Sequence, residues 1–137
     1  MSVPHIDADV IVRTITGDDP LKRAAGERLL GPVQSGEVTF ALASSTVSEV
    51  MFVLTSRGTY AMDRETAKQA VLRIVHLAGM RVENRATVLR ALDLYNTLAT
   101  SFGDAMLIAT MEREGSTEVY SYDRGLSRVP GITRVEP

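Results

Sequence analysis

Residues 3–12 of the chain, Val-Pro-His-Ile-Asp-Ala-Asp-Val-Ile-Val, form an apolar run that is interrupted by acids and then resumes. The first part, which ends at Asp7, is typical of a short buried strand, whereas the aliphatic residues from Val10 onward lie at the spacing of one helix face. A strand followed at once by a helix is the repeating unit of α/β folds. This stretch therefore predicts a strand over residues 3–7 and a helix over residues 9–16.

The same alternation continues to the end of the chain. Further helices are predicted over residues 20–30, 46–56, 64–77, 86–100 and 103–114, and further strands over residues 38–43, 80–82, 118–122 and 132–135. The helix that starts at Pro20 is expected to end at Leu30, because a Gly-Pro pair follows. The alternation predicts an α/β sandwich with a central parallel sheet flanked by helices, and 137 residues fit a single domain over 1–137.

The composition excludes several classes of protein. With 45% apolar and 23% charged residues the chain is in the globular range, and with no cysteine it has neither disulfides nor a thiolate zinc site. The N-terminus lacks the features of a signal peptide and no stretch is apolar enough to span a membrane, so we expect a cytoplasmic protein. The net charge of −2 argues against binding nucleic acid by charge alone.

Four acids stand out because their surroundings carry almost no other charge. They are Asp7, Glu49, Asp104 and Asp123. Two of them end predicted strands and two lie near the start of predicted helices, so a parallel sheet would bring all four to the edge where α/β folds build their sites. A carboxylate directed toward an apolar core is costly unless it is paired or bound to metal. We therefore expect these four residues to form one site.

Each acid also has a simpler explanation. Asp7 is a candidate helix cap, Asp104 suits a helix N-terminus, and Asp123 suits an Asx turn before Gly125. If the acids do converge, a divalent cation is needed to offset their mutual repulsion. Oxygen ligands without His or Cys favour Mg²⁺ or Mn²⁺ over zinc, and a pair of such ions can activate water and stabilise the leaving oxygen of a phosphodiester.

The order and surroundings of these acids resemble the motifs of PIN-domain nucleases. The matching segments are Ile6-Asp7-Ala8-Asp9-Val10-Ile11-Val12-Arg13, Ser48-Glu49, Gly103-Asp104-Ala105-Met106-Leu107-Ile108-Ala109, and Tyr120-Ser121-Tyr122-Asp123-Arg124-Gly125-Leu126 with Val129-Pro130-Gly131-Ile132. The resemblance covers nearly the whole chain in the right order and implies a PIN-like three-layer sandwich. The family's acidic positions carry over to Asp7, Glu49, Asp104 and Asp123, and its hydroxyl position to Ser121.

The size and layout resemble VapC-type toxins of toxin–antitoxin pairs. This resemblance implies an endoribonuclease that needs Mg²⁺ or Mn²⁺, forms a homodimer, and is neutralised by a small antitoxin whose C-terminal segment occupies the active-site groove. Arg13 and Arg124 are candidates for holding RNA phosphates, with plain surface arginines as the alternative. A dimer would use exposed apolar residues, for which Met62, Met80 and Leu126 are candidates. A housekeeping nuclease outside any toxin pair is the alternative to the toxin.

Within the site, Asp7 and Asp104 are expected to be the principal metal ligands. Asp123 would be a further ligand or a water-mediated contact, and Glu49 would bind metal or orient the attacking water. Asp9 stands where the family usually has Asn, so it either adds a negative charge beside the metal or faces away as a cap.

Two rival functions remain at this stage. The pair Asp7 and Asp9 fits the Asp-x-Asp opening of haloacid dehalogenase-type phosphatases, with Asp7 as nucleophile and Asp9 as acid and base. Such enzymes need a lysine near the phosphate, and neither Lys22 nor Lys68 lies just beyond a predicted strand. The other rival is a non-catalytic PIN-like interaction domain, against which the presence of all four acids argues.

Overall fold

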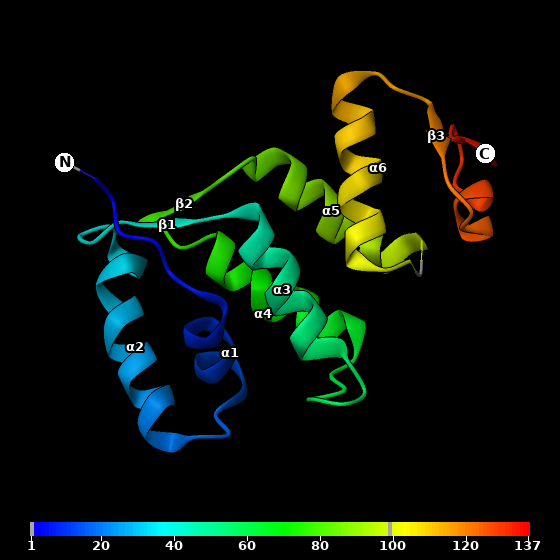
Figure 1. The fold of residues 1–137 in the computed structure, drawn as a ribbon. Coiled ribbons are helices and arrows are strands. Elements are labelled where there is room, and N and C mark those ends of the chain that lie inside the picture. The colour runs from blue at the N-terminus through cyan, green and yellow to red at the C-terminus, as the bar shows by residue number, and fades with distance from the viewer. Residues whose placement is uncertain (1, 99) are drawn as a thin grey trace.

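The computed structural model describes residues 2–98 and 100–137 and contains alternating helices and strands (Figure 1). In chain order the elements are α1 (Ala8–Thr16), α2 (Pro20–Ser35), β1 (Phe40–Leu42), α3 (Ser44–Thr55), α4 (Arg64–Val75), β2 (Met80–Val82), α5 (Arg85–Leu98), α6 (Phe102–Glu114), β3 (Glu118–Tyr120), the 3-10 helix η1 (Arg124–Arg128) and β4 (Thr133–Val135). Each predicted helix is present, which confirms the α/β class. The predicted helix over residues 86–100 is α5, and residue 99 lies outside the described residues.

Several helices begin at side chains that cap them. Asp19 accepts hydrogen bonds from the backbone N–H groups of Leu21 and Lys22 at the start of α2, and Asp63 accepts one from Thr66 at the start of α4. Such caps satisfy backbone donors that have no partner inside the helix. The starts of these two helices were therefore predictable from the sequence.

The predicted end of the second helix at Leu30 is wrong, because α2 continues through Gly31-Pro32 to Ser35. Pro32 removes one helical hydrogen bond. Contacts with neighbouring segments hold the last turn in place: the carbonyl of Val33 accepts from the N–H of Gly79 at 2.9 Å, and the carbonyl of Pro32 accepts from the N–H of Val38 at 3.2 Å. Val33 is also fully buried, so its packing outweighs the local signal to stop.

All strand pairs are parallel, but they form two separate sheets in the described residues. β1 pairs with β2, and β3 pairs with β4. Residues 3–6, called the N-terminal strand below, lie along β1 through a bridge between His5 and Ala41. Figure 1 shows the N-terminal strand, β1 and β2 on one side of α5 and α6, and β3 and β4 on the other. The expected central sheet is therefore divided in two.

The two sheets lie apart because of where α6 ends. α6 packs along α5, and the three residues 115–117 lead directly into β3. β3, η1 and β4 contact one another and form what we call the C-terminal unit, residues 118–135. This unit lies beside α6, on the side away from β1 (Figure 1).

One apolar core connects the helices with both sheets. Met80 and Leu126 belong to it with exposed fractions of 6% and 3%, and Met62 is half-buried against it. The expectation that these three residues are exposed and available to a dimer is therefore wrong, since α4 covers β2 and η1 turns Leu126 inward. Within residues 2–98 and 100–137, no helix has the length and apolar character needed to cross a membrane.

Candidate active site

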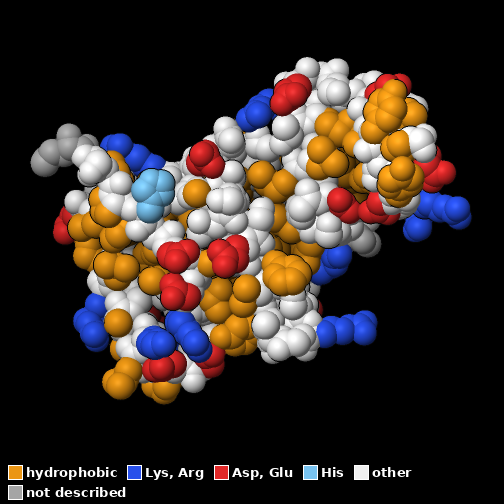
Figure 2. All heavy atoms as spheres, in the orientation of Figure 1, with side chains coloured by type: hydrophobic (Ala, Val, Ile, Leu, Met, Phe, Trp, Pro, Cys, Tyr) orange, Lys and Arg blue, Asp and Glu red, His pale blue; other side chains and the backbone are white. Residues whose placement is uncertain are grey.

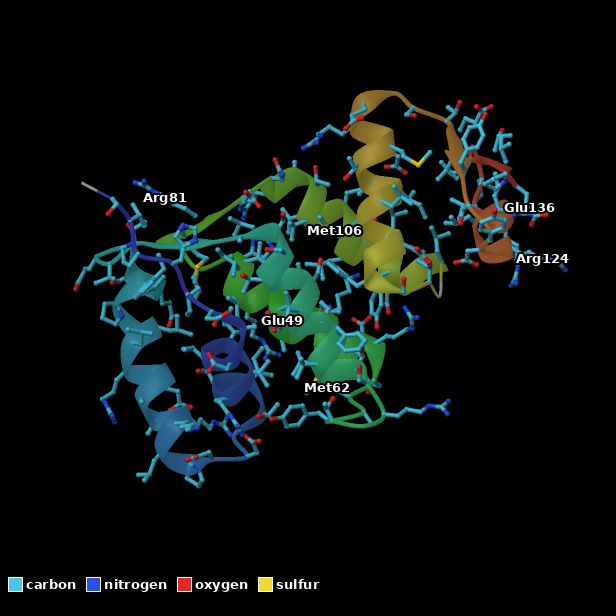
Figure 3. The ribbon with its side chains drawn as sticks, viewed as in Figure 1. Glu49, Met62, Arg81, Met106, Arg124 and Glu136 are labelled. Carbon is cyan, nitrogen blue, oxygen red and sulfur yellow. The ribbon has the colours of Figure 1, made fainter. Side chains whose placement is uncertain are left out.

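Glu49 lies in the second turn of α3 and is exposed. Figure 3 shows it between α3 and α1. A cavity of about 170 Å³ at this junction is lined by Glu49, Asp9 and Arg13, together with Tyr60 from the loop after α3. Two of the acids discussed above, Glu49 and Asp9, are therefore neighbours around one small hollow.

The start of α3 is fixed by an acid that the sequence reasoning missed. The residue before α3 is Ala43, whose side chain cannot cap a helix. Instead Glu83, directly after β2, accepts hydrogen bonds from the backbone N–H and the hydroxyl of Ser44 at 3.0 and 2.8 Å. These two bonds hold the pKa of Glu83 below its usual value, and the bond from the hydroxyl has the larger effect. An acid directly after the strand at residues 80–82 was the signal that could have identified it.

Asp7 lies at the carboxyl end of the N-terminal strand and caps α1. Its Oδ1 accepts a hydrogen bond from the N–H of Ala8 at 2.7 Å, and its side chain is exposed. The capping role and the strand-end position were both predicted. They are compatible, because a cap uses only one of the two carboxylate oxygens.

Arg13 forms an ion pair with Asp18, outside the four candidate acids. Its Nη1 lies 2.6 Å from Oδ2 of Asp18, and the hydroxyl of Tyr60 donates to the same oxygen at 2.7 Å. The bond from Tyr60, with smaller contributions from the hydroxyl of Thr16 and the charge of Arg13, lowers the pKa of Asp18. This network ties the α1–α2 turn to the α3–α4 loop. It favours a structural role for Arg13 over phosphate binding.

Asp104 is half-buried in the first turn of α6. Its N–H donates to Oγ of Ser101, and its Oδ2 accepts from the hydroxyl of Thr100 at 3.2 Å. This segment is anchored by Arg64, whose Nη1 donates to the carbonyls of Thr100 at 2.6 Å and Tyr95 at 2.9 Å. The guanidinium also lies 4.0 Å from the centre of the Tyr95 ring. Asp104 is thus positioned by contacts from α4 and α5.

α3, from its second turn onward, and the first turn of α6 face a common space. A cavity of about 730 Å³ is lined by Ser48, which precedes Glu49, and by Gly103, which precedes Asp104. Its other walls come from the α3–α4 loop and the end of α5. Ser48 and Gly103, the residues that precede Glu49 and Asp104, therefore line the same hollow.

Asp123 lies apart from the other three acids. It follows β3 in the C-terminal unit, is exposed, and its Oδ1 accepts from the N–H of Gly125 at 2.9 Å, as predicted for an Asx turn. Figure 3 shows its neighbour Arg124 at the far side of α6 from Glu49, pointing outward. The separation of the sheets is the reason for this distance.

The four acids do not fit a metal ion as they are placed. Across residues 2–98 and 100–137, no three acidic or histidine side chains are close enough to hold one. Three of the acids are exposed and Asp104 is half-buried, so the expectation that they point toward the core is wrong. The acids lie near the ends of helices and strands, where water can reach and solvate their carboxylates. In Figure 2 acidic side chains gather where α1 and α3 begin, and again between α6 and η1.

None of the four acids is used in an ion pair within the described residues. The arrangement therefore leaves their charges available to a ligand.

The comparisons with known proteins identify the family of this chain. The PIN domain family matches residues 5–132, which is almost the whole length. No curated protein matches the sequence. The matched region contains all four acids and every helix and strand up to η1.

Proposed function

Because the chain belongs to the PIN domain family, whose members are generally nucleases, we propose that it hydrolyses phosphodiester bonds in RNA. The residues proposed to carry the reaction are Asp7, Glu49, Asp104 and Asp123. The observation that carries the proposal is the position of these acids at strand ends and in the first two turns of helices, without ion-pair partners in the described residues. We further propose that Mg²⁺ or Mn²⁺ is required.

The proposal requires an arrangement in which Asp123 joins the other acids. Glu49 lines the hollow at the α1–α3 junction, and Asp7 caps α1. Asp104 follows Gly103, which lines the larger hollow beside α3. Asp7, Glu49 and Asp104 would also have to move closer together, because no three acids of the described residues are near enough to hold one ion.

We also propose that this nuclease is the toxin of a toxin–antitoxin pair. It is supported by the resemblance to VapC-type toxins and by a groove of about 460 Å³ between α1 and α2. The groove is lined by apolar Val10, Ala25 and Leu29 and by the charged residues Asp9, Arg13 and Lys22. An antitoxin segment with apolar side chains and an acidic residue near Lys22 would fit it. Purification with a co-encoded partner, and arrested growth on expression without it, would support this role. Harmless expression of an active enzyme would contradict it.

The catalytic proposal is tested with Asp104→Asn. The substitution keeps the shape of the side chain and removes its charge, so we expect RNA cleavage and Mn²⁺ binding by calorimetry to fall sharply while the protein stays folded. Asp93→Asn, on the surface of α5, is the matched control and should leave both unchanged. EDTA should stop cleavage by the wild type. Equal Mn²⁺ binding and equal cleavage by the wild type and Asp104→Asn would overturn the proposal.

A further inference from the structure

The hollow of about 730 Å³ beside α3 contains an aromatic side chain that the proposed reaction does not use. This residue is Phe52, which is 71% exposed although Met51 and Leu54 of the same helix are fully buried. Figure 2 shows apolar side chains at the surface over α3. One exposed apolar residue would need no explanation by itself. Phe52 is different because it lines a hollow that also reaches the acidic motifs.

Phe52 lies on the same side of α3 as Glu49. Residues three apart on a helix are surface neighbours, with their Cβ atoms about 5–6 Å apart, and both of these side chains are exposed. Across the hollow, Gly103 in the first turn of α6 is the neighbour of Asp104. A strand whose phosphodiester lies beside these acids would therefore bring the base of an adjacent nucleotide to Phe52.

The hollow also offers one cation to a phosphate. Of its two arginines, Arg64 is engaged, because it donates to two backbone carbonyls and lies over the ring of Tyr95. Arg57 is exposed and has no ion-pair partner in the described part of the chain. Asp63 also lines the hollow, but both of its carboxylate oxygens accept hydrogen bonds from Thr66. The charge of Arg57 is therefore available to a ligand.

The composition of the hollow suits a nucleotide better than a second protein. The core of a protein–protein interface is depleted in charged residues. Sites for single-stranded nucleic acid instead combine aromatic faces, on which bases stack, with cations that follow the backbone. The walls here join Phe52 and Arg57 with the hydroxyl groups of Ser48, Thr55 and Ser56. The volume also lies within the range of about 300–1,000 Å³ that is usual for small-ligand sites.

We propose that the ring of Phe52 stacks on one base of the RNA strand and that Arg57 binds a phosphate beside this base. Every base has a π-face, so the site accepts any base and prefers purines, whose face is larger. In a duplex that face is covered by the neighbouring bases, so the site requires an unpaired nucleotide. The position of this base next to the cleaved bond rests on the proposed function, but the binding of base and phosphate does not.

Stacking is tested by the affinity for a fluorescein-labelled single-stranded oligoadenylate, measured by anisotropy in EDTA so that no cleavage occurs. Phe52→Ala should weaken binding by about 5- to 150-fold, the range for the loss of one base–aromatic stack. Phe52→Tyr should bind like the wild type. Phe52→Leu, which is apolar but has no π-face, should bind like Phe52→Ala. Leu21→Ala removes a side chain of α2 that is 83% exposed and lies outside the hollow, so it is the control and should change nothing.

The phosphate contact is tested by the salt dependence of the same affinity. Each phosphate bound on a single strand contributes about 0.7 to the slope of log affinity against log salt concentration. Arg57→Gln should therefore reduce the steepness of this slope by about 0.7. Arg28→Gln, at an exposed arginine of α2 outside the hollow, should leave the slope unchanged. An unchanged slope in Arg57→Gln would overturn the phosphate contact.

Other occupants of the hollow give different results. If Phe52→Ala dissociates an oligomer and leaves the affinity for oligoadenylate unchanged, the hollow joins copies of this chain and the proposal is overturned. Adenosine monophosphate that binds more tightly than oligoadenylate would show a site for a free nucleotide and overturn the assignment to a strand. A wild type that does not bind oligoadenylate overturns the proposal as well.

The same measurements separate this proposal from the proposed function. Binding that depends on Phe52, by a wild type that cleaves no RNA with Mg²⁺ or Mn²⁺, would establish the base site and overturn the proposed function. Equal oligoadenylate binding by Phe52→Ala and an RNA-cleaving wild type would overturn the base site and leave the proposed function standing.

Discussion

Glu83 caps a helix that begins almost forty residues earlier in the chain, through two hydrogen bonds from Ser44. One comes from the backbone N–H at 3.0 Å and the other from the hydroxyl at 2.8 Å. The contact joins the carboxyl end of β2 to the first turn of α3. The orientation of Glu49, one turn further along α3, therefore depends on the end of a strand that is distant in sequence.

Glu83→Gln should lower the Tm at neutral pH, because the amide is a weaker acceptor than the carboxylate. The pKa of Glu83 is held below its usual 4.5 by the bonds from Ser44. The stabilisation of the fold by the ionised Glu83 is therefore complete above the pKa of this group in the unfolded chain. It is lost as the pH falls through the pKa of Glu83 in the folded protein. The Tm difference between wild type and variant should be full at pH 7 and shrink below pH 4.5. Glu37→Gln, an exposed acid outside this contact, is the control. A difference that persists unchanged in acid would contradict the role of the charge.

Arg64→Met should destabilise the fold by about 1–3 kcal/mol, because it removes two hydrogen bonds to carbonyl groups and the contact with the Tyr95 ring. Urea unfolding gives the magnitude. Arg57→Met, an exposed arginine in the neighbouring loop, controls for the loss of a positive charge and should change stability little. Equal effects of the two substitutions would show that Arg64 does not anchor the start of α6.

Gly79→Ala should cost about 2–3 kcal/mol through overpacking. A Cβ at this position would lie 2.0 Å from the carbonyl oxygen of Val38, a backbone atom that cannot rotate away. The same substitution at Gly103, in the first turn of α6, meets no atom closer than 3.9 Å and should stabilise by about 0.5 kcal/mol. Thermal unfolding of the two variants should therefore move in opposite directions. A neutral Gly79→Ala would contradict the close approach of the two segments.

Asp9→Asn separates the nuclease from the phosphatase hypothesis. Asp9 is exposed in the first turn of α1 and borders the hollow beside Glu49, at a position where PIN-domain nucleases usually have Asn. We expect RNA cleavage to be retained or increased, because one negative charge beside the acids is removed. A phosphatase that uses Asp9 as acid and base would lose on the order of 10²–10⁴ in rate on a phosphomonoester. Asp7→Asn, assayed in parallel, should abolish RNA cleavage.

Local signals in the sequence were sufficient for most of the secondary structure. Asp19 and Asp63 cap their helices as expected, and Gly115 ends α6 in a left-handed conformation. Each of these features depends on neighbouring residues only. The end of α2 was missed because Val33 is held by Gly79, a contact that no local pattern reveals.

The residues of the candidate site stay a prediction from the sequence, and their assembly did not follow from it. The isolation of each acid in an uncharged segment identified Asp7, Glu49, Asp104 and Asp123, and their positions at element ends followed from the predicted elements. Whether the strands that carry Asp7 and Asp123 are neighbours is a matter of long-range packing, which alternation along the chain does not specify. The metal requirement and the single-domain organisation stay predictions.

The N-terminal strand has one edge without a partner strand in the described residues, and this free edge has a consequence for synthesis. That strand is made before β3 and β4, and at 5–20 residues per second the interval between them is on the order of ten seconds. Throughout this interval the edge is exposed on the nascent chain. Ribosomes that follow one another on the same messenger carry such chains close together. Two such edges can therefore meet before either chain is complete, which is the condition under which unpaired strand edges associate.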